Sequence, residues 1–360
     1  MGVDADTPSS PKVEIPEGKL RIWLAELRAP FLTGSIIPVV VGASIAWGLY
    51  GVFYWDLFLL TLVVGAFIHL GANVSNDYFD HKSSADDINV EFIRPFTGGA
   101  RMIQLGLLTP SEVLVGSFVF FAIAGAIGVY LALTRGLILL VIGVIGAGSA
   151  FFYTAPPLRF VHRGIGEIFI GLDFGVLLVL AAYFVQVQLF DIESLISSLP
   201  IAILISAILY INEFPDAKAD EAAGKRTIVV RLGKSRAALG YVALISSVYF
   251  VILIGILLDW IRWTTILVFT TLPLSIYAMR HTLRTYDRGF ELAPANASTI
   301  MIHLFTGVFL ILAYVLYGLS AHAFAVAAMS LICLAIVLVA YRKVSAPPPQ
   351  PGVNGSLPDK

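Results

Sequence analysis

The feature that most constrains this chain is a series of apolar runs, each roughly 20 residues long. A run of that length crosses a hydrocarbon core of about 30 Å when it forms a helix. With 58% hydrophobic and 13% charged residues in a chain of 360, the composition excludes an ordinary soluble domain. We therefore predict an all-α fold, a polytopic bundle of transmembrane helices. The ten runs are residues 30–49, 57–79, 111–133, 136–153, 165–188, 195–215, 237–258, 263–279, 298–318 and 321–341.

The basic residues are distributed unevenly between the two sides of these predicted helices. When alternate connections are assigned to alternate sides, all of the 23 Lys and Arg except Arg135 and Arg262 fall on one side. The positive-inside rule places that side, with both chain termini, in the cytoplasm. We expect a multi-pass protein of the cell (plasma) membrane. The net charge of −1 gives no indication of a partner, and we expect membrane lipid around the chain and no nucleic acid.

The two ends of the chain differ from its apolar middle. The amino-terminal end is rich in Pro, Asp, Glu and Ser, and the carboxyl-terminal end is rich in Pro and Gly. Residues 1–29 are therefore predicted to be a disordered tail followed by an interfacial helix, which ends where Pro30 begins the first span. Residues 30–344 form the predicted transmembrane domain, and residues 345–360 are a second disordered tail.

Carboxylates and basic residues combine at the end of the sixth apolar run, in the stretch NEFPDAKADEAAGKRTIVVRLG. On a helix, Asn212, Asp216 and Asp220 share one face because they are spaced four residues apart. Stacked carboxylates repel one another unless a cation lies between them, and Mg²⁺ takes such oxygen ligands together with substrate phosphate. Lys225 and Arg226 follow, where they can meet other phosphate oxygens. The alternative is a solvated, charged loop.

A second acidic segment ends the second apolar run. Asn73, Asp77 and Asp80 are spaced i, i+4 and i+7, on one helical face, and Asp86 follows soon after the expected helix end. Charged groups at the end of an apolar helix usually face a cavity, a partner or an ion. Any one of them could instead be a helix-end cap. Two such segments on the same predicted side favour one site for metal and diphosphate, with Asp77 close to Asp216.

Two further connections on this side carry candidate residues. Gly98 and Gly99 let backbone amides approach an anion, and Arg94 and Arg101 beside them supply fixed charge; an ordinary turn is the alternative. In the next connection, Pro156 and Pro157 force an extended break between Tyr153 and Arg159. Tyr153 is either an interfacial aromatic anchor or a catalytic residue.

These segments form four ordered motifs. They are Asn73-x-x-Asn-Asp77-Tyr-Phe-Asp80 with Asp86, Arg94-Pro-Phe-Thr-Gly-Gly, Tyr153-Thr-Ala-Pro-Pro with Gly164-Ile-Gly-Glu167, and Asn212-x-x-x-Asp216-x-x-x-Asp220 with Gly224-Lys-Arg-Thr-Ile-Val-Val-Arg-Leu-Gly233. From about Pro30 to His303, the chain resembles the UbiA superfamily of intramembrane prenyltransferases. The likeness is greatest to the menaquinone-pathway branch, which prenylates 1,4-dihydroxy-2-naphthoate. Two positions depart from the pattern: Ser84-Ala-Asp86 lacks a usual Gly, and Arg159 replaces a frequent Lys.

The resemblance implies a helical bundle around a central cavity, usually with nine spans, so nine to ten transmembrane helices are expected here. It also implies an isoprenyl diphosphate donor, Mg²⁺ and an aromatic quinone-precursor acceptor. The implied metal ligands are Asp77, Asp80, Asp86, Asp216 and Asp220. The implied diphosphate-binding residues are Arg94, Arg101, Lys225 and Arg226. The residues assigned to catalysis are Asn73, Asp77, Tyr153, Arg159, Asp173 and Asn212, of which Asp173 lies outside the family motifs.

Asp173 lies well inside the fifth run, where an ionisable group is costly and suggests function. We expect it to face the cavity and to contact the acceptor's hydroxyl or take up a proton. The alternative is a neutral Asp bonded to a neighbouring helix.

Other functions stay open at this point. Intramembrane Asp and Asn pairs also occur in cation-coupled secondary transporters. Within the enzyme hypothesis, the acceptor could instead be hydroxybenzoate, a chlorin, haem or a glycerol-phosphate lipid. The sequence leaves the oligomeric state open.

Overall fold

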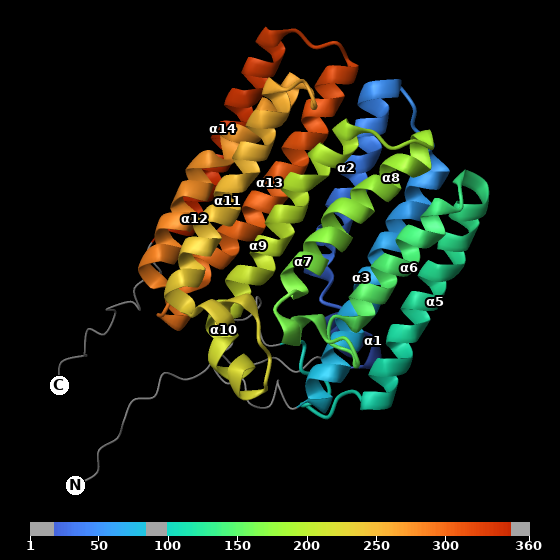
Figure 1. The fold of residues 1–360 in the computed structure, drawn as a ribbon, viewed down its shortest axis with the longest axis vertical. Helices are drawn as coiled ribbons and strands as arrows, with labels where there is room; N and C mark the ends of the chain where they lie inside the picture. Colours follow the sequence, from blue (N-terminus) through green and yellow to red (C-terminus); the bar gives the residue numbers. More distant parts are fainter. Residues whose placement is uncertain (1–17, 84–98, 347–360) are drawn as a thin grey trace, which may run out of the picture.

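Helices make up all the regular secondary structure in the residues that the computed structural model describes, 18–83 and 99–346 (Figure 1). The first half contains α1 (Lys19–Glu26), η1 (Ala29–Leu32), α2 (Thr33–Tyr50), α3 (Trp55–Lys82), α5 (Pro110–Arg135), α6 (Ile138–Phe152), η2 (Phe160–Arg163), α7 (Gly166–Ile170), the π-helical η3 (Gly171–Leu177) and α8 (Leu178–Val187). The second half contains α9 (Ile192–Ala222), α10 (Ile228–Leu232), α11 (Lys234–Leu257), η4 (Trp263–Thr271), α12 (Leu272–Thr285), η5 (Gly289–Leu292), α13 (Ala293–Gly318) and α14 (Ala323–Ser345).

Eight helical stretches are long and apolar enough to cross a membrane. They are Ala29–Tyr50, Trp55–Lys82, Pro110–Arg135, Gly166–Val187, Ile192–Ala222, Lys234–Leu257, Gly289–Gly318 and Ala323–Ser345. The other two predicted runs are also helical: α6 has 15 residues, and the run at 263–279 is divided between η4 and α12. The prediction of an all-helical, multi-pass membrane protein is therefore confirmed.

Helix ends follow from local sequence. Thr109 and Glu112 form a reciprocal capping box at the start of α5, where Pro110 occupies the first turn. Asp191 and Ser194 form the equivalent pair at the start of α9. Gly51 ends α2 in the left-handed conformation, which a glycine adopts without steric cost.

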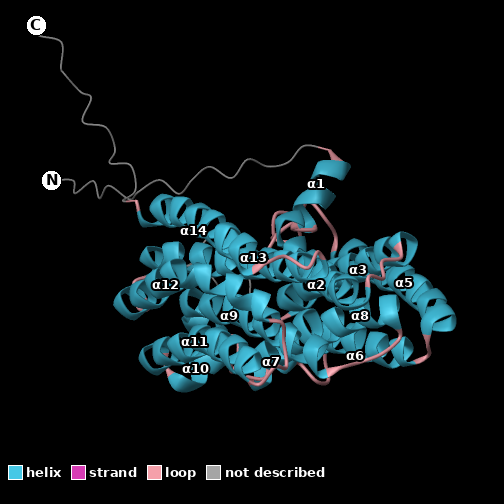
Figure 2. Cartoon of the chain, turned by 90° about the horizontal axis from the view of Figure 1, so that it is seen from above, coloured by secondary structure: helices cyan, strands magenta, loops and turns pink. Residues whose placement is uncertain are grey.

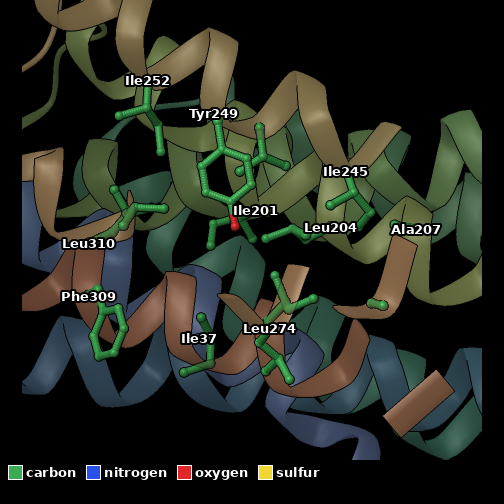
Figure 3. Close-up of a cluster of buried hydrophobic side chains, with 14 of the residues drawn as sticks. Ile37, Ile201, Leu204, Ala207, Ile245, Tyr249, Ile252, Leu274, Phe309 and Leu310 are labelled. Carbon is green, nitrogen blue, oxygen red and sulfur yellow. The ribbon is translucent and has the colours of Figure 1, made fainter. Parts of the chain in front are cut away.

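The main core lies among α2, α9, α11, α12 and α13, and Figure 3 shows part of it. Ile37 from α2 and Ile201 and Leu204 from α9 pack there with Ile245 from α11 and Leu310 from α13 (Figure 3). Because lipid is as apolar as these side chains, close packing rather than water exclusion holds such helices together.

Viewed from above, the bundle is elongated, with α11, α12 and α14 at one end and α5 and α6 at the other (Figure 2). α9 lies between these groups and contacts α11, α13 and η3, while α3 packs against α5 (Figure 2). The carboxyl-terminal ends of α3 and α9 both lie at the lower end of the bundle in Figure 1, near α1 and α10. This arrangement brings the two acidic segments to the same end.

α1 docks onto the same end of the bundle. Ile22 packs in a small core with Val74 of α3 and Val113 of α5. The Trp23 ring lies over Gly116, where an added Cβ would stand 2.6 Å from it. Lys19 makes an ion pair of 2.5 Å with Glu112. The predicted interfacial helix is thus held by α3 and α5.

Candidate functional site

A cavity of about 540 Å³ lies where α3 and α9 end. The polar side chains that line it are Arg28, Thr33, His69, Asn73, Asn76, Asp80, Tyr153, Asn212, Glu213, Asp216, Asp220, Lys225, Thr227 and His303. Its apolar wall includes Phe31, Phe174, Ile205, Ile208, Leu209 and Ile300. A charged end next to an apolar wall suits a ligand with an anionic head and a hydrocarbon tail.

Lys225 joins the two acidic helices. Its Nζ lies 2.8 Å from Oδ1 of Asp80 on α3 and 3.9 Å from Oδ1 of Asp220 on α9. All three side chains are largely buried, with exposed fractions of 11–14%. The backbone NH of Lys225 also donates to the carbonyl of Asp220 at 2.8 Å, which keeps the residue at the helix end. The predicted meeting of the two acidic segments therefore occurs through Asp80 and Asp220.

Asp77 has a different environment from Asp80. Its carboxylate is buried and pairs with Arg28, and it accepts a hydrogen bond from the NH of Ala100 at 3.3 Å. Asp77 is not among the described residues that line the cavity, but Arg28 is. The conformation of Arg28 is left-handed, with φ 48°, at the turn that precedes η1. Asp77 thus contacts the site through Arg28 and does not face Asp216 across the cavity.

Asn212 is held by a residue that the sequence patterns did not single out. Nδ2 of Asn296, at the start of α13, donates to Oδ1 of Asn212 at 2.7 Å and to the carbonyl of Ile211 at 3.3 Å. Asn296 is fully buried. Because the Asn212 oxygen accepts this bond, its amide nitrogen is the group of this cavity-lining side chain that is left to donate.

Two connections dock onto each other beside Tyr153. Oε1 of Glu167 accepts from the NH of Ile228 at 2.9 Å, and Nη2 of Arg231 donates to the carbonyl of Arg163 at 2.8 Å. A Cβ added at Gly166 would lie 2.8 Å from the Tyr153 ring, so the absence of a side chain at Gly166 allows the ring to pack against the backbone there. Tyr153 lines the cavity.

His162 belongs to the same pair of connections. Its carbonyl accepts from the NH of Arg226 at 3.3 Å. Burial, and then the positive charges of Lys225 and Arg159, lower the pKa of His162 from its ordinary value. His162 is therefore neutral at pH 7, and the positive charge near the cavity comes from Lys and Arg.

The charges that line the cavity suit a bound divalent cation. Four carboxylates, those of Asp80, Glu213, Asp216 and Asp220, outnumber the cations of Arg28 and Lys225. The donor atoms are carboxylate and amide oxygens, which are the ligands of a hard cation such as Mg²⁺. Among residues 18–83 and 99–346, no three His, Cys, Asp or Glu converge closely enough to form a complete metal set. The residues present fit a cation that is also held by a substrate phosphate.

Several predicted residues lie elsewhere. Asp86 and Arg94 are outside the described residues. Arg101, Arg159 and Arg226 are described but do not line the cavity, and the side chains of Arg159 and Arg226 are exposed. Asp173 lies in a separate cavity, and Gly99 lines the first one with φ 68°. The structure therefore gathers the predicted aspartates of α9 with Asp80, Asn73, Tyr153 and Lys225.

Sequence patterns missed several polar residues at this site, among them Arg28, Glu213 and Asn296. Arg28 counted only as a cytoplasmic charge, although it immediately precedes the first span. Glu213 lines the cavity beside Glu167, and its signal was its place directly after Asn212. Asn296, a buried amide at the start of an apolar run, was the third.

The fold and the cavity define a multi-pass α-helical membrane protein whose cavity has a charged end and an apolar wall. The chain belongs to the UbiA prenyltransferase family, whose profile matches residues 35–297. This match covers the polar residues that line the cavity except Arg28, Thr33 and His303, and it confirms the predicted family and prenyltransferase class.

Curated relatives and solved structures agree with this membership. The chain is 29% identical over 302 residues to the 2-carboxy-1,4-naphthoquinone phytyltransferase of Synechocystis, covering 83% of this chain and 95% of that protein. It is 28% identical over 285 residues to the 1,4-dihydroxy-2-naphthoate octaprenyltransferase of Bacillus subtilis, covering 78% and 87%. A UbiA homolog from Archaeoglobus fulgidus, bound to GPP and Mg²⁺, has the same fold with a TM-score of 0.51 at 16% identity, covering 81% of this chain and 99% of that one.

Proposed function

We propose that this protein transfers an isoprenyl group from an isoprenyl diphosphate to a naphthoate-type aromatic acceptor within the membrane, with Mg²⁺ as cofactor. The observation that carries the proposal is the pairing of Asp80 and Asp220 through Lys225 at the charged end of a cavity with an apolar wall. The printed names of the naphthoate and naphthoquinone relatives support the acceptor class.

The charged end of the cavity is suited to a diphosphate. Lys225 and Arg28 supply positive charge for its oxygens, and Asn73 and Asn212 supply amides that select its orientation. Mg²⁺, when bound, offsets the charge of the diphosphate and makes it a better leaving group. Asp80, Asp216 and Asp220 would hold the cation, with Asp86 as a further candidate. Asp77 positions Arg28.

The apolar wall is suited to the isoprenyl chain. When the bond between the allylic carbon and the diphosphate breaks, positive charge develops on the hydrocarbon. Ile205, Ile208 and Leu209 of α9 exclude water from this part of the cavity, so an aromatic ring can react with the allylic carbon instead. Tyr153 lies where α6 ends at the same cavity and would flank the reacting carbon.

We further propose a topology of ten crossings. In addition to the eight candidate spans, α6 and the η4–α12 segment each cross the membrane once, so that consecutive connections alternate between its two sides. The excess of Lys and Arg on one side supports a cytoplasmic cavity mouth and cytoplasmic termini, with the protein in the plasma membrane.

The experiment that tests the proposal uses the full chain purified into lipid nanodiscs. It is incubated with geranylgeranyl diphosphate and 1,4-dihydroxy-2-naphthoate, with Mg²⁺ or with a chelator, and both released diphosphate and prenylated naphthoquinol are measured. We expect product only with Mg²⁺, and a loss of about 10²-fold or more in Asp80→Asn and Asp220→Asn. Uptake of a solute into vesicles without cleavage of the diphosphate bond would contradict the proposal.

A further inference from the structure

A second cavity, of about 280 Å³, lies between α3, α5, α6, η3 and α8. Gly125 and Gly128 of α5 and Gly143 and Gly146 of α6 line it. A Cβ added at any of these four glycines would meet no atom within 4 Å, so they leave space open instead of bringing helices into contact. Val129 of α5 and Val144 of α6 also line the cavity and are 44% and 72% exposed, so the cavity reaches the lipid-facing surface at these two helices.

One ionisable group faces this apolar space among the described residues that line it. Asp173 of η3 is 8% exposed, and its Oδ2 accepts a hydrogen bond of 2.6 Å from Oγ of Ser149 on α6. Its Oδ1 is buried and has no hydrogen-bond partner within residues 18–83 and 99–346. A buried oxygen left without a partner is costly, so it points to a ligand that donates a hydrogen bond.

The second cavity adjoins the first. Ala150 and Phe174 line both cavities, and they directly follow Ser149 and Asp173 in the chain. A molecule held at Asp173 would therefore lie next to Phe174, which also lines the cavity that contains Lys225 and the aspartates. Tyr153, on the turn after Ala150, lies on the other side of this boundary.

The isoprenyl chain of the donor does not account for this second cavity. The first cavity has its own apolar wall, formed by α9 and α13 next to the acidic end. A hydrocarbon chain in the second cavity would also leave Oδ1 of Asp173 without a partner. An aromatic ring that bears a hydroxyl fills apolar space and supplies the missing donor.

We propose that the α5–α6 cavity is the entry and binding site of the hydroxylated aromatic acceptor, whose hydroxyl donates to Oδ1 of Asp173. The acceptor enters from lipid between α5 and α6 and presents its ring at the Ala150–Phe174 boundary. This inference rests on the proposed prenyl transfer, since it assigns a site to the second substrate. Ser149 holds the carboxyl in place through the shortest contact of its hydroxyl, and the carbonyls of Ile145 and Gly146 are the other acceptors within reach of that single hydrogen.

The first test changes Asp173. Asp173→Leu removes the hydrogen bond and keeps the bulk, whereas Asp173→Asn keeps an oxygen acceptor. Loss of one hydrogen bond to this carboxyl group should raise the KM for 1,4-dihydroxy-2-naphthoate by about tenfold in Asp173→Leu. The KM for geranylgeranyl diphosphate should stay within about twofold, and Asp173→Asn should recover most of the acceptor affinity. Equilibrium binding of 1,4-dihydroxy-2-naphthoate without donor or Mg²⁺ should weaken in parallel.

The second test fills the cavity. Gly143→Leu places a side chain into it, and Gly148→Leu is the matched control, because Gly148 lies on the same helix with open space at its Cβ but does not line the cavity. We expect weaker acceptor binding and a raised acceptor KM only in Gly143→Leu. This test stands even if Asp173→Leu fails to fold.

The outcomes separate this inference from the proposed function. If the wild-type protein forms no prenylated product, the proposed function fails. If the wild-type protein is active but Gly143→Leu restricts the accepted donor length and leaves the acceptor KM unchanged, the cavity holds the isoprenyl chain and this inference is overturned. Unchanged acceptor binding in both Asp173→Leu and Gly143→Leu also overturns it.

Discussion

Lys225 is the residue whose removal tests the site most directly. It is the only described cation within 4 Å of both Asp80 and Asp220, at 2.8 and 3.9 Å. With an effective dielectric constant of about 20, these separations correspond to attractions of about 6 and about 4 kcal/mol before desolvation is counted. Breaking a buried ion pair by removing one partner costs about 3–5 kcal/mol, because it leaves uncompensated charge. Lys225→Met should therefore destabilise the protein and weaken the diphosphate site together.

Two measurements separate these effects. Without Mg²⁺, the apparent melting temperature of Lys225→Met in nanodiscs should fall, and the double variant Asp80→Asn with Lys225→Met should recover part of the loss, because it removes one carboxylate of the pair. In the transfer assay, both variants should lose about 10²- to 10³-fold in kcat/KM for the donor, because neither has the cation that meets the diphosphate. Lys218→Met, on the exposed face of the same helix end, is the matched control and should retain activity.

Either of two results would refute this reasoning. Wild-type turnover in Lys225→Met would show that the ammonium does not contribute to diphosphate binding. A double variant that melts no higher than Lys225→Met would show that uncompensated charge is not the cause of the instability.

Three other predictions follow from the same contacts. Arg28→Gln should lower kcat/KM about 10²-fold, since it removes both a cavity charge and the partner of Asp77, whereas the exposed Arg21→Gln should not; equal rates would contradict the role of Arg28. Gly164→Ala should lower thermal stability more than Gly224→Ala. Both glycines have a positive φ, where an added Cβ costs about 1–2 kcal/mol, but only at Gly164 would that Cβ also lie 2.5 Å from Nε of Arg231. Tyr314→Phe, far from the cavity, should cost about 1–3 kcal/mol of stability and leave KM unchanged, because it removes bonds to Ser197 and Glu193; a changed donor KM would show coupling between the two ends of the bundle.

The sequence alone determined the fold class and predicted that the two acidic segments lie at the same end of the bundle. Apolar runs of membrane-crossing length leave helices as the main solution, because lipid offers no partner for backbone polar groups. The spacing of Asp80, Asp216 and Asp220 also follows from helical geometry, which is local. These properties depend on neighbours within one or two helical turns, so they can be read from the chain before it folds.

Only the tertiary structure decided which of these residues contact one another or line the same cavity. Periodicity places Asp77 and Asp80 near one face of the helix. It cannot show that Asp77 pairs with Arg28 and Asp80 with Lys225. It could not place Asn296 beside Asn212, 84 residues away in sequence, or show that the glycines of α5 and α6 leave a cavity beside Asp173. Such contacts join helices distant in sequence, and packing of the whole bundle sets them.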